Sequence, residues 1–542
     1  MITTDVIIIG AGHNGLVCAA YLLQQGYDVL LLEKREVPGG AATTEALMPD
    51  LSPEFKFNRC AIDHEFIFLG PVTQELNLAH YGLEYLFCDP SVFCPQLDGR
   101  AFMAYRSLDQ TCEHIARYSP RDAGKYREFI GFWTSLMTAI QPMFNVPPQD
   151  VIAIAQAYGF DNLQELWAIA GSKNKALDFI RTMITSPEDI LNEWFDSELV
   201  KAPLARLCAE IGAPPSQKGT SSGMMMLAMR HGHGIARPKG GTGALVEALV
   251  KLVTEKGGKI LTDQTVKRVL VENGTAIGVE TATGEQYRAN RGVISNIDAR
   301  RVFLQLVEPG ALATVDQSLA ERLERRTVNN NEAILKIDCA LSELPQFTAA
   351  QSPQDLIGTI LIADSVRHVE EAHALIGFGQ IPDQNPSLYC DIPSLLDPTL
   401  APAGKHTLWI EFFAPYQIAG REGTGLMGTG WTDELKEQVA DRVINKLADY
   451  APNLKDLIIG RHVESPAELA QRLGSYNGNV YHLDMTLDQM MFLRPLPEIA
   501  NYQTPIKNLY LTGAGTHPGG SISGMPGRNC ARVFLKQQRR FW

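Results

Sequence analysis

The chain lacks several features that assign proteins to common functional classes. Acidic residues outnumber basic ones and give a formal net charge of −13 over 542 residues, so the sequence does not supply the basic face that nucleic acid needs. The nine cysteines form no CxxC pair, which argues against a zinc site or a disulfide framework and favours reduced thiols in an intracellular protein. No HExxH motif, Walker loop or Ser/His/Asp order is present. We therefore expect no nucleic-acid partner and no metal.

Long hydrophobic runs are also missing. No stretch reaches the roughly eighteen uninterrupted apolar residues typical of a membrane-spanning helix. The first apolar run, DVIIIGAG, is short, broken by glycine and without the charged region that opens a signal peptide. These absences argue against a spanning helix and leave an interfacial one open. The chain length predicts two or three domains with ample apolar core.

The first forty residues contain a dinucleotide-binding pattern. A β-branched run leads into Gly10-x-Gly12-x-x-Gly15, an apolar-periodic helix, and a second strand that ends at Glu33. Gly10 permits the tight turn, Gly12 lets the backbone approach a pyrophosphate, and Gly15 lets the helix pack closely on the strand. Glu33 is placed to accept hydrogen bonds from the hydroxyls of an adenosine ribose. Its negative charge disfavours NADP, because it would repel the 2′-phosphate. The pattern by itself leaves FAD and NAD open.

A second glycine-rich stretch, LTGAGTHPGGSISGMPG at residues 511–527, lies close to the other end of the chain. It follows an apolar NLYL segment and is typical of a strand, a glycine turn and the start of a helix. Together with Gly39 and Gly40, it favours FAD, extended from the first loop to the second. A helix N-terminus at the second loop would stabilise the negative charge of reduced flavin. We predict one FAD, bound without a covalent link.

These motifs resemble the phytoene desaturase-like branch of the FAD-dependent amine oxidase superfamily. The resemblance is carried by IIGAGHNGLVCAAYL, LLEKREVPGG, PKGGTGALVEALVKLVTEKGGKILTDQTVKRVLVENGTAIGV and NLYLTGAGTHPGGSISGMPG. Within the branch, the length and details such as AGHNGLVCAAYL are most similar to CrtO-type β-carotene ketolases. The cofactor-binding residues that we predict on this basis are Gly10, Gly12, His13, Asn14, Gly15, Glu33, Lys34, Gly39, Gly40, Val266, Gly513, Gly515, Gly519, Gly520 and Met525.

The resemblance implies an α/β fold with three parts. A Rossmann-like FAD-binding domain is expected from residues 1–75, 232–300 and 490–542, and a mixed-sheet substrate domain from residues 301–489. A helical insert is expected at residues 76–231. Local patterns predict further elements. GGTGALVEALVKLVTEKGGKI is expected to form a helix that glycine turns open and Gly257-Gly258 closes, and Asn273-Gly274 between two β-branched runs predicts a hairpin. The glycine-rich GREGTGLMGTGW is expected to be a loop.

The expected chemistry belongs to the flavin, because few polar residues stand out as catalytic. The resemblance implies oxidation of the C4 methylene of a β-ionone ring to a carbonyl, which converts β-carotene to echinenone and further to canthaxanthin. A carotene desaturase or isomerase, and a flavin-binding protein without turnover, remain alternatives. Electrons would pass to oxygen or to a membrane quinone. His517 is a candidate proton carrier, with a structural hydrogen bond as its alternative. Arg59, Asp63 and His64 belong either to a buried loop or to a flavin or substrate contact.

The region from residue 106 to 224 has a helical pattern rich in aromatic residues, isoleucine and methionine. Pro142, Pro147 and Pro148 are expected to break it into short helices, and VIAIAQAYGF is one apolar segment within it. It either caps a core or docks on a membrane surface, which would place the protein peripherally on the cytoplasmic side and admit a lipid-soluble substrate. The adjacent methionines 224–226 are core filler or substrate contacts. Basic residues suited to anionic headgroups are Lys201, Arg206, Lys218, Arg230, Arg237 and Lys239.

Overall fold

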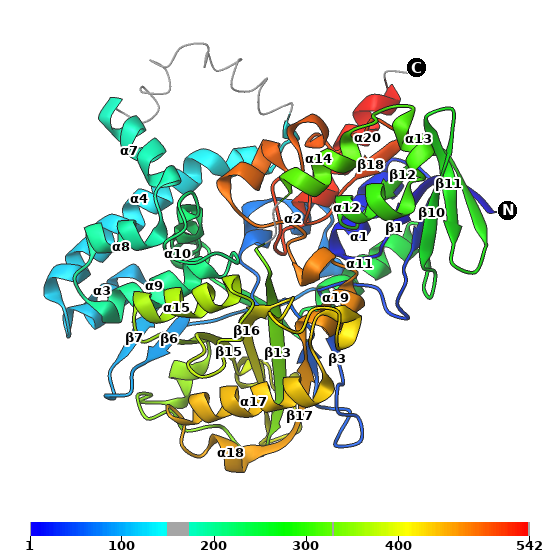
Figure 1. Ribbon diagram of the computed structural model, residues 1–542. Coiled ribbons are helices and arrows are strands. Elements are labelled where there is room, and N and C mark those ends of the chain that lie inside the picture. Colours follow the sequence, from blue (N-terminus) through cyan, green and yellow to red (C-terminus); the bar gives the residue numbers. More distant parts are fainter. Residues whose placement is uncertain (1, 149–172, 328–329, 540–542) are drawn as a thin grey trace.

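The computed structural model describes residues 2–148, 173–327 and 330–539. Its main elements are two seven-stranded sheets and a group of helices (Figure 1). This is the predicted α/β class, with a Rossmann-like dinucleotide-binding part joined to a mixed-sheet part. The predicted segment VIAIAQAYGF, at residues 151–160, lies outside the described residues.

The first sheet collects strands from distant parts of the chain. Its order is β10-β11-β12-β1-β2-β9, with β18 paired to β12. The contacts of β1 with β2 and β12, of β2 with β9, and of β12 with β18 are parallel. The strands are β1 Ile2–Ile9, β2 Val29–Leu32, β9 Lys259–Leu261, β10 Val266–Glu272, β11 Thr275–Thr281, β12 Gln286–Ser295 and β18 Leu509–Leu511. The sheet therefore brings the two glycine-rich loops to one edge.

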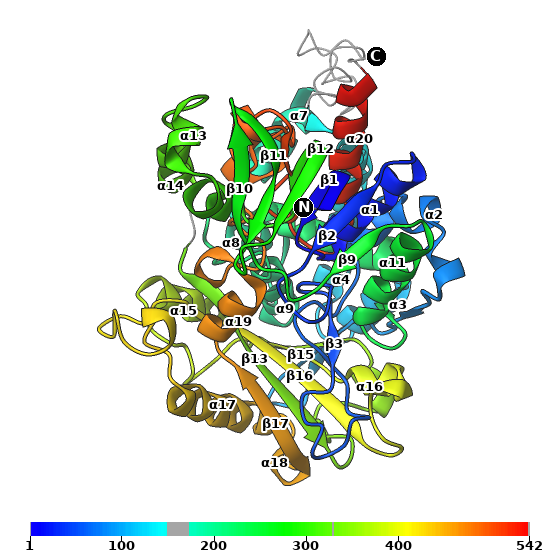
Figure 2. The same ribbon diagram turned by 90° about the vertical axis from the view of Figure 1, so that its right-hand side faces the viewer.

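The helices that follow the two loops lie side by side. Helix α1, His13–Gln24, starts directly after the first loop, and α20, Met525–Arg539, starts after the second (Figure 2). Gly527 allows their close approach, because a Cβ atom there would lie 2.2 Å from the carbonyl oxygen of Asn14. The two ends of the chain thus meet in one layer against the sheet.

Two local predictions in the middle of the chain are confirmed. Strands β10 and β11 form an antiparallel hairpin, with Asn273 at φ 51° and Gly274 at φ 70°, the left-handed pair that a tight two-residue turn requires. The apolar-periodic stretch before it forms α11, Gly243–Glu255, whose buried face includes Leu245, Leu249 and Leu252.

The second sheet has the order β17-β13-β16-β15-β14-β6-β7. Alternate residues of β13, among them Leu335, Ile337 and Cys339, belong to one apolar core with α17, Asp433–Ala448. The strands are β6 Val92–Pro95, β7 Ala101–Ala104, β13 Glu332–Leu341, β14 Thr359–Ile362, β15 Leu388–Asp391, β16 His406–Pro415 and β17 Ile458–Glu464. Strands β6 and β7 fall inside the range predicted as a helical insert, 76–231. These four-residue strands have too little pattern to separate them from the helices that follow.

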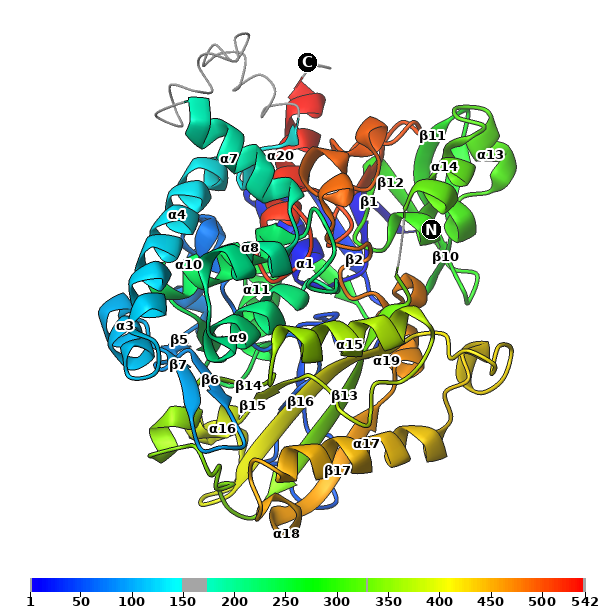
Figure 3. The same ribbon diagram turned by 60° about the vertical axis from the view of Figure 1, so that its left-hand side comes forward.

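The helical group lies beside both sheets (Figure 3). It contains α3 Leu108–Ala116, α4 Pro120–Phe144, α7 Lys173–Ile184, α8 Pro187–Trp194, α9 Glu198–Ala209 and α10 Met225–Gly232. The expected break at Pro142 is wrong, because α4 runs for 25 residues and includes this proline in its last turn. A proline so near a helix end disturbs little of the hydrogen-bond ladder. Within the described ranges, no helix combines the length and apolarity needed to cross a bilayer.

Candidate flavin site

A cavity opens at the edge of the first sheet where β1 and β2 end. Its empty volume is about 1080 Å³, part of which is open solvent. Nine of the predicted cofactor-binding residues line it: Gly10, Gly12, His13, Asn14, Glu33, Lys34, Gly39, Gly40 and Val266. Residues from two more distant segments, Asn296–Ile297 and Arg472–Ser475, complete the wall.

The glycines of the first loop are required by the space around them. Gly10 has φ +90°, and a Cβ atom at Gly15 would lie 2.4 Å from the carbonyl oxygen of Gly10. Gly12 would place a Cβ atom 3.0 Å from Nδ2 of Asn296. Gly15 is not part of the cavity wall and instead lies beneath the turn, where it allows α1 to start close to the strand. The first loop is thus a cradle that side chains would fill.

Glu33 is fixed at the cavity by two backbone groups. Its side chain is buried, Oε2 accepts a hydrogen bond from the N–H of Ala11 at 2.9 Å, and Oε1 accepts one from the N–H of Arg35 at 3.0 Å. A carboxylate has about four lone-pair sites, so acceptor capacity remains for ribose hydroxyls. This geometry fits the role that the sequence predicts for Glu33.

The cavity has a cationic wall that the sequence analysis mostly missed. Lys34 was predicted, but Arg35, Arg301 and Arg472 also line the cavity. Burial is the main cause that lowers the pKa of Lys34 to about 8. Arg301 and Arg472 lie far from the first loop in the sequence, so no local pattern indicated them. Arg35 pairs with Glu45 and Arg472 with Glu464, while Lys34 and Arg301 donate to backbone carbonyls. Lys34 and Arg301 therefore favour a ligand with negative charge.

Several buried polar atoms around the cavity have no hydrogen-bond partner in the described part of the protein. They include Nη1 of Arg35, Nη1 of Arg472, Oε1 of Gln264 and Nδ1 of His482. Such atoms are costly to bury unless a ligand or water satisfies them. Their donors and acceptors, with the cationic wall, fit the pyrophosphate and adenosine of FAD.

The second loop reaches the cavity through Ala514. Its neighbour Gly513 has φ +93°, and a Cβ atom there would lie 2.8 Å from Oδ1 of Asn296. Gly515 approaches the ring of His482. These contacts hold the second loop against Asn296 and His482, which line the same cavity as the first loop. For Gly513 and Gly515, the role as direct cofactor contacts remains a prediction.

The remaining predicted residues of this loop pack against protein side chains. A Cβ atom at Gly519 would lie 2.8 Å from Cε of Met485, and one at Gly520 would lie 2.4 Å from Cδ1 of Tyr481. Met525 is buried in the apolar cluster of the helical group. None of the three is among the residues that line the cavity, and their contact with flavin stays a prediction.

His517 occupies a structural position. Its side chain is completely buried, and Nε2 lies 2.9 Å from the carbonyl oxygen of Met143 at the end of α4. The hydroxyl of Tyr502 donates a hydrogen bond to the carbonyl of His517 at 2.7 Å. Burial lowers the pKa of His517 to about 4, and His517 does not line the cavity. These contacts favour a hydrogen bond that joins the loop to α4 over the proposed proton carrier.

Protein side chains provide partners for the cluster of Arg59, Asp63 and His64. Arg59 pairs with Glu464 at 2.7 Å, Asp63 accepts from the hydroxyl of Tyr389 at 2.6 Å, and Nδ1 of His64 lies 2.9 Å from the hydroxyl of Tyr85. Arg59 and His64 are buried, and the side chain of Asp63 is 7% exposed. These contacts favour the buried-loop interpretation.

Most of the basic residues expected to face lipid headgroups are buried in ion pairs. Arg206 pairs with Glu210 at 2.6 Å, and Arg230 pairs with Glu65 at 2.7 Å. Lys201 pairs with Glu198 and Arg237 with Asp63, and these four basic residues are at most 9% exposed. The prediction that they meet anionic headgroups is wrong, because carboxylates neutralise them inside the fold. The partners of Lys201 and Arg206 are one helical turn away, and those of Arg230 and Arg237 come from a distant segment. The side chain of Lys218 is exposed, and that of Lys239 is about half exposed.

The face of the second sheet opposite α17 carries buried charge that the sequence analysis missed. Lys336 and Asp338 on β13 form an ion pair. The carboxyl groups of Glu411 on β16 and Glu210 hydrogen bond to each other, so one of the two carries a proton. Burial, reinforced by Glu210, holds the pKa of Glu411 well above its usual range. Alternation along β13 and β16 places these residues on one face, and Glu210, the partner of Glu411, comes from the end of α9.

Comparison with known proteins agrees with this architecture. Residues 8–67 match the model of an NAD(P)-binding Rossmann-like domain, and residues 183–363 match that of a flavin containing amine oxidoreductase. Pyridine nucleotide-disulfide oxidoreductase domain-containing protein 2 of Rattus norvegicus is 32% identical over 98% of this chain and 93% of its own. The chain belongs to the phytoene desaturase-like superfamily of flavin-containing amine oxidoreductases. It is an FAD-dependent oxidoreductase.

Other members of this superfamily are similar along nearly their whole length. A limonene dehydrogenase chain from Castellaniella defragrans is 28% identical over 98% of this chain and 94% of its own. A phytoene desaturase (lycopene-forming) of Pseudescherichia vulneris is 25% identical over 96% of both chains. The crystal structure of an oxidoreductase from Methanosarcina mazei has a TM-score of 0.62 at 17% identity, covering 98% of this chain and all of that one. The structural similarity confirms the fold.

Proposed function

We propose that this flavoprotein oxidises an allylic C–H bond of a lipid-soluble polyene, and that its substrate is β-carotene. The product would be echinenone, and canthaxanthin if the second ring reacts. The motifs AGHNGLVCAAYL and THPGGSISGMPGRN support the ketolase assignment by resemblance. The relatives named as phytoene desaturase and limonene dehydrogenase support oxidation of a hydrocarbon in general.

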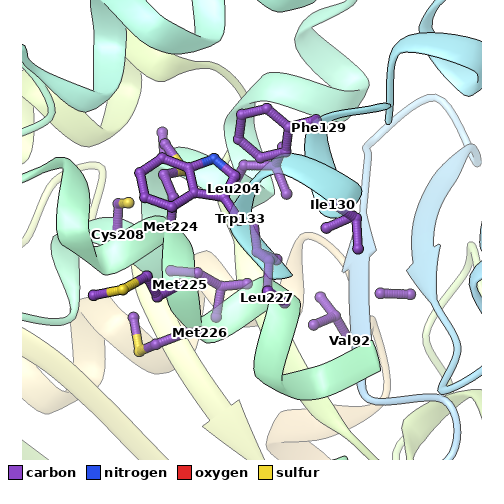
Figure 4. Close-up of a cluster of buried hydrophobic side chains, with 14 of the residues drawn as sticks. Val92, Phe129, Ile130, Trp133, Leu204, Cys208, Met224, Met225, Met226 and Leu227 are labelled. Carbon is purple, nitrogen blue, oxygen red and sulfur yellow. The ribbon is translucent and has the colours of Figure 1, made fainter. Parts of the chain in front are cut away.

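The observation that carries the proposal is the apolar cluster of the helical group. It includes Phe129, Trp133 and Met224–Met226 (Figure 4), and it extends to Met525 at the start of α20. These side chains are at most 9% exposed, so a substrate that reached the flavin from the side of α20 would have to move them apart, and it would then contact hydrocarbon and thioether groups. Such side chains suit a long irregular polyene.

The proposed reaction needs little acid–base catalysis by protein side chains. Conversion of a ring CH₂ group to C=O with water as the source of the oxygen atom, CH₂ + H₂O → C=O + 4 H⁺ + 4 e⁻, removes four electrons, so each ring requires two reductions of the flavin, and the electrons pass on to oxygen or a quinone. Flavin supplies the electron-accepting chemistry when bound. A cation formed at the allylic carbon would be delocalised over the conjugated chain. The protein's task is then to orient the ring and exclude bulk water.

Peripheral attachment to the cytoplasmic side of a membrane would give access to such a substrate. In α7, the side chains of Leu177, Ile180 and Ile184 are 50%, 50% and 55% exposed. Their spacing places them on one helical face, while Phe179 and Met183 pack against the apolar cluster. We propose that this exposed face of α7, rather than the buried basic residues, contacts the bilayer.

Pigment analysis in two carotenoid-producing hosts tests the proposed reaction. In cells that accumulate β-carotene, the protein should produce echinenone, and in cells that accumulate phytoene it should produce no new desaturated pigment. A catalytically silent control is Glu33→Arg, for the reason given in the Discussion. Desaturated products in the phytoene host, with β-carotene unchanged in the other host, would show that the protein is a desaturase and not a ketolase. Geometric isomers alone would indicate an isomerase.

A further inference from the structure

Arg494 lies directly behind the second flavin loop and is completely buried. All five of its N–H groups point at backbone carbonyl oxygens. Nε donates to Ala514 at 2.8 Å, and Nη1 donates to Gln489 at 2.7 Å and Asp484 at 3.1 Å. Nη2 donates to Leu483 at 3.0 Å and to Tyr481. The guanidinium thus ties segment 481–489 to the second loop.

This guanidinium has no carboxylate partner. Across residues 2–148, 173–327 and 330–539, no Asp or Glu oxygen lies within 4.0 Å of it, whereas the other buried arginines are all paired: Arg59, Arg206, Arg230, Arg237 and Arg300. Burial lowers the pKa of Arg494 to about 9, so it is charged at neutral pH. A buried charge without a counter-ion is costly. Asp298 and Asp484 attract the guanidinium from more than 4.0 Å away, but burial outweighs them, so the fold's own side chains compensate this positive charge only in part.

The carbonyl that Nε binds belongs to Ala514, the second-loop residue that lines the flavin cavity. The charge is thus separated from the cavity by one peptide unit. FAD carries a pyrophosphate dianion, and reduced flavin adds a further negative charge. We propose that Arg494 is a positioning residue that supplies the built-in counter-charge of bound FAD, and that it acts through the second loop without touching the cofactor.

A purely structural role is the competing explanation, and two substitutions separate it from the proposal. Arg494→Lys keeps the charge and loses hydrogen bonds, while Arg494→Gln also loses hydrogen bonds but removes the charge. If the charge matters, titration of the apoprotein should show FAD affinity about tenfold or more weaker in Arg494→Gln, and within about threefold of wild type in Arg494→Lys. Equal losses in both variants, or no loss in Arg494→Gln, would overturn the proposal.

A third variant leaves the contacts of Arg494 intact and covers the case in which both substitutions prevent folding. Asp484 offers its backbone carbonyl to Arg494, while its carboxylate accepts from Nδ2 of Asn479 at 2.9 Å and from the N–H of Asn330 at 3.0 Å. Burial raises the pKa of Asp484 to about 7, so it is mostly ionised near pH 8. Asp484→Asn should then tighten FAD binding about threefold at that pH, and unchanged or weaker binding would contradict the electrostatic role.

The same variants show whether the charge of Arg494 stabilises the pyrophosphate of FAD alone or the reduced flavin ring as well. If it acts on the pyrophosphate, Arg494→Gln should also weaken binding of ADP and leave the flavin midpoint potential unchanged. If it also acts on reduced flavin, ADP binding should weaken as before and the potential should in addition become more negative in Arg494→Gln than in Arg494→Lys. Either result supports a counter-charge, and neither readout depends on turnover.

Discussion

At the scale of single residues, the flavin site depends on groups whose contacts fix them before any ligand binds. Glu33 is held by two backbone N–H groups at the cavity wall, and Gly15 allows no side chain next to Gly10. The two residues have different roles: Glu33 is placed to bind the cofactor, and Gly15 permits the tight turn. Sequence spacing alone indicated both, since the constraint on each is local.

Glu33→Arg should abolish retention of FAD. The substitution removes a charged acceptor worth about 1.5–3 kcal/mol for each hydrogen bond, and it adds a cation to a wall that already holds Lys34, Arg35, Arg301 and Arg472. The expected loss of affinity is about a hundredfold or more, measured from the flavin absorbance of purified protein. Glu36→Arg makes the same change at an exposed position nearby and should keep the flavin. A full yellow spectrum in Glu33→Arg would show that the N-terminal assignment is wrong.

His517→Gln tests whether His517 is structural. Burial lowers the pKa of His517 from 6.5 to about 4. Between these pH values His517 therefore binds a proton in the unfolded chain but stays neutral in the folded protein. The free energy of unfolding therefore falls on acidification by up to about 1.4 kcal/mol per pH unit from this group. Glutamine can still donate to Met143 but does not titrate, so the variant should lose less stability than wild type between pH 6 and pH 5.

Thermal unfolding at several pH values, compared between variant and wild type, measures this difference for His517→Gln. Other groups cancel in the comparison, including Glu65, whose pKa burial raises to about 7. The structural role also predicts that turnover falls by no more than a few-fold. A large loss of turnover in a variant that retains flavin and stability would restore His517 as a proton carrier.

At the scale of elements, local patterns indicated the strand, turn and helix that begin the chain, the hairpin at Asn273–Gly274, and α11. Each depends on periodicity or turn chemistry within a few residues. The strands β6 and β7 were not predicted, because β6 joins the second sheet by pairing with the distant β14, and β7 joins it by pairing with β6. Arg230 was assigned to a membrane surface, because its partner Glu65 comes from a distant segment and could not be recognised before the fold was known. The partner of Arg206, Glu210, lies four residues along the chain, and what could not be recognised there was the burial of the pair.

Replacing the exposed residues of α7 by serine tests membrane attachment. Leu177, Ile180 and Ile184 are each about half exposed, so their burial in a bilayer would contribute about 3 kcal/mol in total, or roughly a hundredfold in partitioning. The triple variant should therefore lose sedimentation with liposomes, while Phe378→Ser, at an exposed apolar residue elsewhere, should not. High salt should leave wild type bound and detergent should release it, because attachment is apolar. Release by salt alone would contradict this mechanism.

At the scale of the whole molecule, the two glycine-rich loops meet because a parallel sheet brings together strands from both ends of the chain. Pairing of β1 and β18 with opposite sides of β12 sets the distance between the loops. The sequence predicted this meeting from the loops alone. It did not predict that Arg301, Arg472 and Arg494 come from the region between them, because only the complete fold brings that region to the cofactor.

The central claim is that the flavin held by both ends of the chain oxidises β-carotene, and anaerobic mixing tests it most directly. Purified protein with bound FAD is mixed with β-carotene in detergent micelles in the absence of oxygen, and the flavin absorbance is followed together with the pigment products. We predict that β-carotene bleaches the flavin and yields a pigment oxidised at the ring, and that phytoene leaves the flavin oxidised. A flavin that stays oxidised with β-carotene, but is bleached by phytoene or by an amine, would contradict the account.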